Sequence, residues 1–201
     1  MASDALSRLV EAAERDNLVA LRKILDQEQP DLNAEVIIGE EYDLDEPDEI
    51  PLLFYLIQKQ VSREAIELLL DAGMDLSYIN REGLGAVDIA VKYRRKDILE
   101  LCKKAGIDLS TTRRKSGMTP LMLAAAFNDT EMLEYLLEQG ASLDTIDAYG
   151  MTALDYARKM GQSRMEELLK EKGAKHKLYA SEKEEHEKRE DRNEKGLPTS
   201  N

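Results

Sequence analysis

Residues that could carry out catalysis are sparse in this sequence. Histidine occurs only as His176 and His186, in or beside a charged C-terminal segment, so the chain before them offers no imidazole base. Cysteine occurs once, as Cys102, and these counts exclude a His-based triad and a zinc site of histidines and cysteines. We therefore expect no catalytic residue, no metal site, no cofactor and no enzymatic activity.

Two other ligand-binding patterns also fail on spacing. An EF-hand loop that begins at Asp43 requires glycine at position 48 and glutamate at position 54, where this chain has Asp48 and Phe54. This acidic run is therefore compatible only with weak, non-specific cation binding. The glycines never show the G-x-x-x-x-G-K spacing of a phosphate-binding loop.

The single cysteine and the hydropathy pattern bear on the cellular compartment. Cys102 lies among Ile98, Leu99 and Leu101, which favours a buried, inert thiol over a reactive one, and no intramolecular disulfide can form. No basic segment followed by an apolar run opens the chain, and no stretch approaches the roughly 20 apolar residues of a membrane helix. We expect a cytoplasmic protein that does not enter a membrane.

Charge is unevenly distributed along the 201 residues. The net charge of −13 argues against binding to nucleic acid or anionic membrane, because both are also negative. Residues 28–49 hold ten carboxylates and no Lys or Arg, whereas residues 80–115 hold ten basic and five acidic residues. Tryptophan is absent and Phe occurs twice, so a core of aliphatic residues and Ala is expected, which favours packed helices.

Glycines recur at a fixed period. Gly73, Gly106, Gly140 and Gly173 are separated by 33, 34 and 33 residues, and each follows a helix-like apolar run such as Met132 to Leu137. A second series, Gly83, Gly117 and Gly150, keeps the same period. The most regular unit runs from Thr119, a natural N-cap before Pro120, to Gly140, which would end a second helix in the left-handed conformation.

These residues resemble the ankyrin repeat, in which a turn glycine precedes Thr-Pro-Leu-His-x-Ala-Ala and Leu-Leu-x-x-Gly-Ala follows the second helix. The matching segments are Thr119-Pro120-Leu121 with Ala124-Ala125 and Gly140-Ala141, then Thr152-Ala153-Leu154 with Gly173-Ala174, and more weakly Gly85-Ala86-Val87 with Ala90. Ile50-Pro51-Leu52 begins a further unit, with two extra residues expected near Gln60 to Ser62. Five repeats over residues 3–175 are implied.

The resemblance implies an all-α solenoid of stacked helix-turn-helix units with short β-hairpin turns. Its expected divisions are a capping repeat (1–27), an acidic insertion (28–50) with a strand or hairpin arm at Val36 to Gly39, repeat 2 (51–79), repeat 3 (80–113), repeat 4 (114–146), a capping repeat (147–175), and a charged tail (176–201) that is a frayed helix or disordered. Asp88 and Asp155 stand where the family prefers His, and we expect each to hydrogen-bond within its own turn instead of acting as a catalytic pair.

Ankyrin repeats bind partners through hairpin tips and the first helices that line a concave groove. Applied to this sequence, that resemblance implies the partner-binding residues Arg81, Lys92, Tyr93, Lys115, Met118, Phe127, Tyr149, Met151, Lys159 and Met160. Exposed aromatic and Met side chains at the repeat period are typical of binding hot spots, although one or two of them could instead turn inward. The neighbouring lysines favour a protein partner that carries an apolar anchor on an acidic segment. We expect the protein by itself to be a monomer.

Several alternatives stay open at this point. The basic patch of repeat 3, Arg94-Arg95-Lys96 with Lys103, Lys104 and Arg113-Arg114-Lys115, is either an ordinary charged surface, a site for an acidic ligand or enzyme partner, or the docking place of the acidic insertion. The protein could then be an accessory subunit of an enzyme. The insertion could be autoinhibitory or could itself contact a partner.

Overall fold

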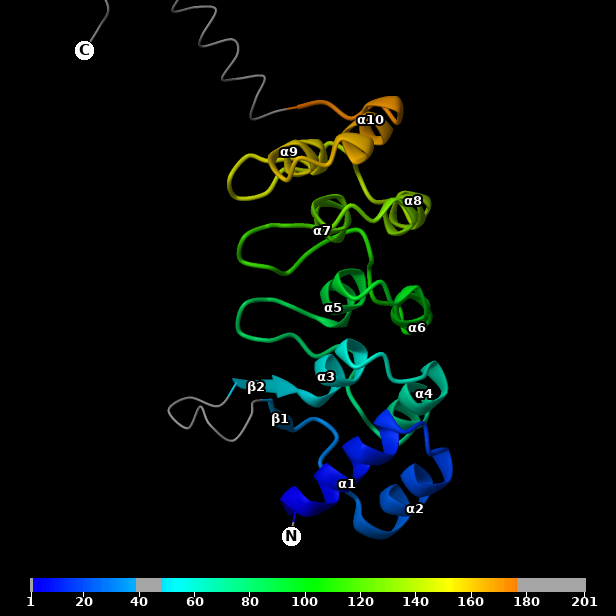
Figure 1. The fold of residues 1–201 in the computed structure, drawn as a ribbon. Coiled ribbons are helices and arrows are strands. Elements are labelled where there is room, and N and C mark those ends of the chain that lie inside the picture. The colour runs from blue at the N-terminus through cyan, green and yellow to red at the C-terminus, as the bar shows by residue number, and fades with distance from the viewer. Residues whose placement is uncertain (1, 39–47, 177–201) are drawn as a thin grey trace, which may run out of the picture. The chain divides into compact units, whose positions relative to one another are not determined.

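The computed structural model describes residues 2–38 and 48–176, and the chain divides into two compact units, residues 1–109 and 110–201 (Figure 1). The predicted tail beyond residue 176, with His186, and the centre of the acidic insertion at 39–47 lie outside the described residues.

The first unit consists of successive helices with one hairpin. Its elements are α1 (Ala2–Glu14), α2 (Leu18–Glu28), β1 (Glu35–Ile38), β2 (Asp48–Pro51), α3 (Leu52–Gln58), α4 (Arg63–Asp71), α5 (Ala86–Lys92) and α6 (Lys96–Lys104). Helix α1 packs on α2 and α5 packs on α6, while α3 contacts both α1 and α5. Leu9, Leu21, Leu56 and Ile66 are completely buried between these helices. The helices therefore share one aliphatic core.

The second unit repeats the same arrangement. It contains α7 (Pro120–Ala126), α8 (Thr130–Glu138), α9 (Ala153–Lys159) and α10 (Ser163–Glu171). Helix α7 packs on α8 and on α9, and α9 packs on α10. Ala124, Ala125 and Ala157 are fully buried, and such small side chains let neighbouring helices approach closely. In both units the predicted all-helical fold of paired helices is confirmed, and none of the helices in 2–38 and 48–176 is long and apolar enough to cross a membrane.

The acidic insertion contains an antiparallel hairpin. Strand β1 pairs with β2 in a register that places Val36 opposite Ile50, so residues 36–38 of the arm predicted at Val36 to Gly39 form a strand, and Gly39 lies outside the described residues. The hairpin lies between α2 and α3, the connection that corresponds to residues 79–85 between α4 and α5, where Ile79 and Gly85 form a single antiparallel bridge. Both connections project from the same side of the unit (Figure 1). The β1–β2 pair thus takes the place of an ordinary repeat hairpin in this connection.

The caps of the most regular unit are as the sequence predicts. Thr119 Oγ1 accepts a hydrogen bond from the backbone N–H of Met122 at 3.3 Å, and Pro120 is the first helical residue, where a missing N–H costs little. Gly140, after α8, has φ +93°, the left-handed conformation that glycine adopts without steric cost. Local capping chemistry therefore sets the limits of this helical pair.

The expected two-residue insertion near Gln60 to Ser62 is corrected to one. Residues 59–62 connect α3 to α4, whereas three residues, 127–129, connect α7 to α8. The second of the two extra residues comes from the position of the proline, because Pro51 precedes α3 as its N-cap whereas Pro120 is the first residue of α7. A proline can occupy either position, so it is an imprecise marker of where a helix begins.

Candidate protein-binding surface

A groove of about 530 Å³ in the first unit brings together all three binding residues that were predicted there, Arg81, Lys92 and Tyr93. Its walls come from the β1–β2 hairpin and α3 on one side, and from the loop before α5 and the end of α5 on the other. The apolar side chains that line it are Ile50, Pro51, Phe54, Tyr78, Leu84 and Ile89. A cavity of this size accommodates a few side chains of a bound segment.

The loop that carries Arg81 is held by Asn80. The side-chain Oδ1 of Asn80 accepts from the backbone N–H groups of Glu82 and Leu84, both at 2.9 Å. The Asn80 N–H in turn donates to the Leu84 carbonyl oxygen at 2.9 Å. An asparagine that closes its own turn in this way reduces the freedom of the tip. Arg81 is therefore presented at the groove, exposed, on an ordered loop.

Lys92 and Tyr93 occupy the C-terminal end of α5. Lys92 is the last helical residue, and its Nζ lies 5.2 Å from the centroid of the Tyr93 ring, a cation–π contact. Gln60 Nε2 donates to the Tyr93 carbonyl oxygen at 3.0 Å, which satisfies a group left unpaired at the helix end. Lys92 is exposed and Tyr93 is half-buried, so the pair offers an apolar ring beside a positive charge.

The charge of this groove is mixed, in contrast to the basic groove that the lysines predicted. Glu35 and Glu49 of the hairpin and Glu82 of the loop line it together with Arg81 and Lys92. The sequence does not show that the hairpin borders this groove, so the carboxylates of Glu35 and Glu49 could not be included in the predicted charge. Electrostatics alone therefore does not select an acidic partner for this groove.

In the second unit, exposed apolar residues follow the first helix of each pair. Phe127 and Met160 are the residues directly after α7 and α9, and they are 42% and 50% exposed. Tyr149, at the tip of the loop before α9, is 69% exposed, and Lys115 and Lys159 are exposed as well. Such residues match the composition of binding hot spots.

Two further residues of the second unit refine this surface. Met118 is half-buried, and its sulfur accepts from Arg114 Nη1 at 3.2 Å. Ile146 is 52% exposed beside the same hairpin and was not among the predicted residues. A β-branched residue one position before Asp147 gives no signal in sequence that distinguishes it from a core residue.

The prediction that Met151 contacts a partner is wrong. Its side chain is only 3% exposed. The Met151 N–H donates to Asp147 Oδ1 at 2.9 Å, and its carbonyl oxygen accepts from the Asp147 N–H at 3.0 Å. These two hydrogen bonds close a turn over residues 147–151. This closed turn directs the side chain inward, immediately before the N-cap Thr152 of α9. Met151 thus belongs to the buried core.

The two aspartates that could suggest acid–base chemistry have structural roles, as expected. Asp88 Oδ2 accepts from the Gly85 N–H at 3.0 Å, and Asp155 Oδ2 accepts from the Thr152 N–H at 2.9 Å, so each caps its own helix. The ring nitrogen Nδ1 of His176 lies 2.9 Å from Asp155 Oδ1. Sequence reasoning placed His176 at the edge of the charged tail and gave no sign of this contact.

The remaining predicted groups are also placed. Cys102 is completely buried on α6, which confirms its predicted burial, and burial raises the pKa of its thiol to about 12. Arg95 was counted in the basic patch but is 6% exposed, with both oxygens of Asp97 accepting from its guanidinium at 2.9 and 2.7 Å. Within the described ranges, no group of three or more His, Cys, Asp or Glu residues could hold a metal ion.

A family model for ankyrin repeats (3 copies) matches residues 106–180. The chain is 32% identical over 102 residues to the NF-kappa-B inhibitor cactus of Drosophila melanogaster, which is 50% of this chain and 20% of that protein. It is 32% identical over 115 residues to the putative ankyrin repeat protein YahD of Escherichia coli K12, 54% of this chain and 57% of YahD. It is 30% identical over 105 residues to the glycerophosphocholine phosphodiesterase gde1 of Schizosaccharomyces pombe, 52% of this chain and 9% of that protein.

The chain therefore spans less than two thirds of each of these relatives. The count of five repeats over residues 3–175 stays a prediction, because the family model covers a shorter segment. The period of the glycines, the paired helices of both units and these matches agree. The chain therefore contains ankyrin repeats, which the family model matches over residues 106–180, and such repeats generally bind other proteins.

Proposed function

We propose that this protein binds a target protein and catalyses no reaction of its own, acting as an inhibitor, escort or scaffold. The observation that carries the proposal is the groove of the first unit, where Arg81, Lys92 and Tyr93 converge on an apolar floor. The exposed Phe127, Tyr149 and Met160 supply a second apolar contact surface. The structural roles of Asp88 and Asp155 support binding over catalysis, since both carboxylates already cap helices.

The name of one relative, NF-kappa-B inhibitor cactus, supports inhibition as the form that this binding takes. An inhibitor of this kind occupies its target without chemistry, and a groove lined by repeat tips suits that role. The alignment covers 20% of cactus, so inhibition enters here as part of the proposal.

The proposal is tested by capturing proteins from a native lysate with the wild type, a Tyr93→Ala/Phe127→Ala variant and a Val19→Ala control. Val19 is 79% exposed on α2 and lines neither surface. We expect a target that the wild type and the control retain and the double variant loses. Phe127→Ala alone should weaken its binding by about 2 kcal/mol, because truncation of an interface aromatic removes buried apolar area. Retention of the same proteins by all three chains, with unchanged melting curves, would reject both surfaces.

A second candidate, an accessory enzyme subunit or acidic-ligand binder that uses the repeat-3 patch, has a narrower basis. Arg94, Lys96, Lys103 and Lys104 are exposed in the first unit, whereas Arg95 is buried against Asp97. A Lys103→Glu/Lys104→Glu variant separates the two readings. Loss of the captured target with this variant, together with retention by Tyr93→Ala/Phe127→Ala, would favour the patch.

The role of the acidic insertion can be tested without disturbing the sheet. Replacing residues 39–47 with Asn-Gly keeps the pairing of Ile38 with Asp48, since a two-residue turn closes an antiparallel hairpin. Because Glu35 and Glu49 already line the groove beside Arg81 and Lys92, tighter target binding after this replacement would identify the insertion as autoinhibitory. Weaker binding would identify it as part of the contact surface.

A further inference from the structure

We propose that the first unit carries a second binding site, a cleft between α1 and β1 that receives a basic protein segment through an apolar anchor side chain. This cleft is separate from the groove lined by Arg81, Lys92 and Tyr93, called the target groove below, and does not depend on the function proposed for that groove.

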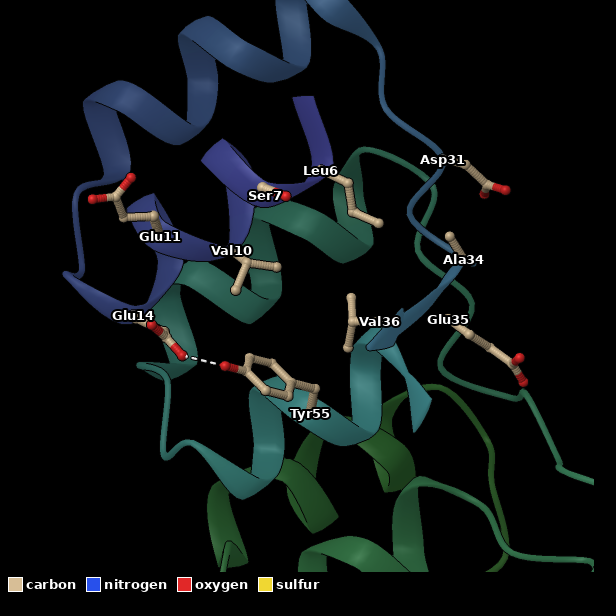
Figure 2. Close-up of a pocket in the computed structure, with 10 residues that line it drawn as sticks. All are labelled: Leu6, Ser7, Val10, Glu11, Glu14, Asp31, Ala34, Glu35, Val36 and Tyr55. Carbon is tan, nitrogen blue, oxygen red and sulfur yellow. Dashed lines mark hydrogen bonds between the residues drawn. The ribbon is translucent and has the colours of Figure 1, made fainter. Parts of the chain in front are cut away.

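The cleft has a volume of about 670 Å³ and is bounded by α1, the segment 31–36 and Tyr55 of α3 (Figure 2). Its apolar lining consists of Leu6, Val10, Ala34, Val36 and Tyr55. Figure 2 shows Val10, Val36 and the Tyr55 ring around one space. All five side chains are only half-buried, so they present apolar surface that the first unit leaves uncovered. A pocket of this volume holds one or two large apolar side chains.

Helix α1 carries more apolar surface than its packing on the core requires. Ala5, Leu9, Ala12 and Ala13 are buried. Leu6 and Val10 lie four residues apart, and this spacing places them together on a helix face beside the buried one. This apolar pair is only half-buried, so it presents surface that a partner side chain can cover.

The wall formed by Tyr55 is fixed in position. Its phenol O–H donates to Glu14 Oε1 at 2.6 Å, which links α3 to the end of α1 (Figure 2). Lys59 Nζ lies 5.4 Å from the centre of the same ring. A ring held from α1 by a hydrogen bond and from its own helix by a cation keeps the cleft open in a defined shape. The site is thus preformed.

The charged residues that line the cleft all carry negative charge. Glu11, Glu14, Asp31 and Glu35 are among the ten lining residues, which include no Lys or Arg. Figure 2 shows Asp31 and Glu35 pointing outward from the segment that forms one edge. Glu11 pairs with Arg15 at 2.8 Å, but both side chains are more than half exposed, so solvent screens this pair. An apolar floor inside an acidic rim is complementary to an apolar side chain flanked by Lys or Arg.

The experiment selects ligands from a phage library of random 12-residue peptides displayed against the full chain. We expect the wild type to enrich peptides in which Leu, Ile, Met or Phe is flanked by Lys or Arg. Synthetic copies of the enriched peptides are then titrated by fluorescence anisotropy. Val10→Arg should raise the Kd of these peptides at least tenfold, because the arginine fills the cleft and repels the Lys or Arg of the peptide. Val19→Arg, at an exposed position on α2 outside the cleft, should leave the Kd unchanged.

Charge is tested with a second matched pair and the groove with a third variant. Glu11→Lys should weaken binding, and Asp26→Lys, the same charge change at an exposed site outside the cleft, should not. Tyr93→Ala should leave these peptides bound, which separates the cleft from the target groove. No enrichment of such peptides, equal affinity of Val10→Arg and Val19→Arg with unchanged melting curves, or loss of binding on Tyr93→Ala alone would overturn the proposal.

Discussion

The phenol of Tyr156 donates a hydrogen bond of 2.6 Å to Oδ2 of Asp147. The other oxygen of this carboxylate, Oδ1, accepts from the N–H groups of Tyr149 and Met151, both at 2.9 Å. Asp147 is 6% exposed and Tyr156 is 9% exposed, so the bond lies in the interior. One buried carboxylate therefore connects helix α9 to the tip that presents Tyr149 to solvent.

Tyr156→Phe should lower the free energy of unfolding by about 2 kcal/mol, because Asp147 Oδ2 loses its donor while buried. It should also weaken target binding although Tyr156 itself is buried, since the tip loses an anchor. Urea unfolding and capture of the target measure the two effects. Tyr149→Phe is the control for stability, since this side chain is 69% exposed, and its cost should be within about 0.5 kcal/mol. Equal stability of the two variants would show that the Asp147 bond does not hold the tip.

Gly117→Ala should be more destabilising than Gly140→Ala, although both glycines have positive φ, +71° and +93°. A Cβ on Gly117 would lie 3.1 Å from the Ala148 nitrogen and 3.3 Å from the Asp147 Cα, whereas nothing lies within 4 Å of one on Gly140. The left-handed backbone alone costs about 1 kcal/mol for alanine, and we expect about 1 kcal/mol more at Gly117 from this contact. Thermal or urea unfolding of the pair provides the measurement. Equal losses would mean that residues 147–148 move aside freely.

The helical pairs were predictable because their signals are local. Thr119, Pro120 and Gly140 satisfy or avoid backbone groups at helix ends, and these requirements can be read from residue type alone. A second periodic feature was missed: Asp16, Gln60, Arg94 and Asn128 take positive φ after the first helices, as Gly161 does. Only one of the five is glycine, so composition does not reveal the series.

The exposure of the predicted binding residues was predictable only in part, because it depends on tertiary contacts. Lys92, Tyr93 and Phe127 follow from their place at the end of a first helix, which the repeat period gives. Met151 was misplaced, since its inward direction depends on two hydrogen bonds with Asp147. The cleft beside α1 was missed altogether, because Val36 and Tyr55 meet Val10 only after the insertion has folded into a hairpin.

Cys102 should resist alkylation in the native protein. Burial raises the pKa of its thiol to about 12, so almost none is thiolate at pH 8, and the side chain has no exposed surface. Iodoacetamide at pH 8 should label less than about 1% of native chains in the time that labels urea-unfolded chains completely, a comparison that mass spectrometry makes directly. Rapid labelling of the native protein would contradict a packed α6, and the unfolded sample serves as the internal control for reagent activity.

Tyr55 should make stability fall between pH 10 and pH 12. Burial, and secondarily its hydrogen bond to Glu14, raises the pKa of this phenol from 10.0 to about 12 in the folded protein. Below pH 10 the phenol is protonated in both states, so its contribution to stability is complete. Between these values it ionises in the unfolded chain first, which favours unfolding, and above about 12 both states are ionised.

The measurement is the difference in unfolding free energy between the wild type and Tyr55→Phe at pH 9 and at pH 11.5. All other groups are shared by the two proteins, so the difference isolates the contribution of Tyr55. We expect the advantage of the wild type to shrink at the higher pH, because only its residue 55 can lose a proton. Glu14→Gln removes the charged acceptor and should reduce this pH dependence, since a neutral amide raises the phenol pKa less than a carboxylate does. A difference that stays constant from pH 9 to 11.5 would show that the Tyr55–Glu14 bond is not maintained in solution, and the wall of the cleft would then not be fixed.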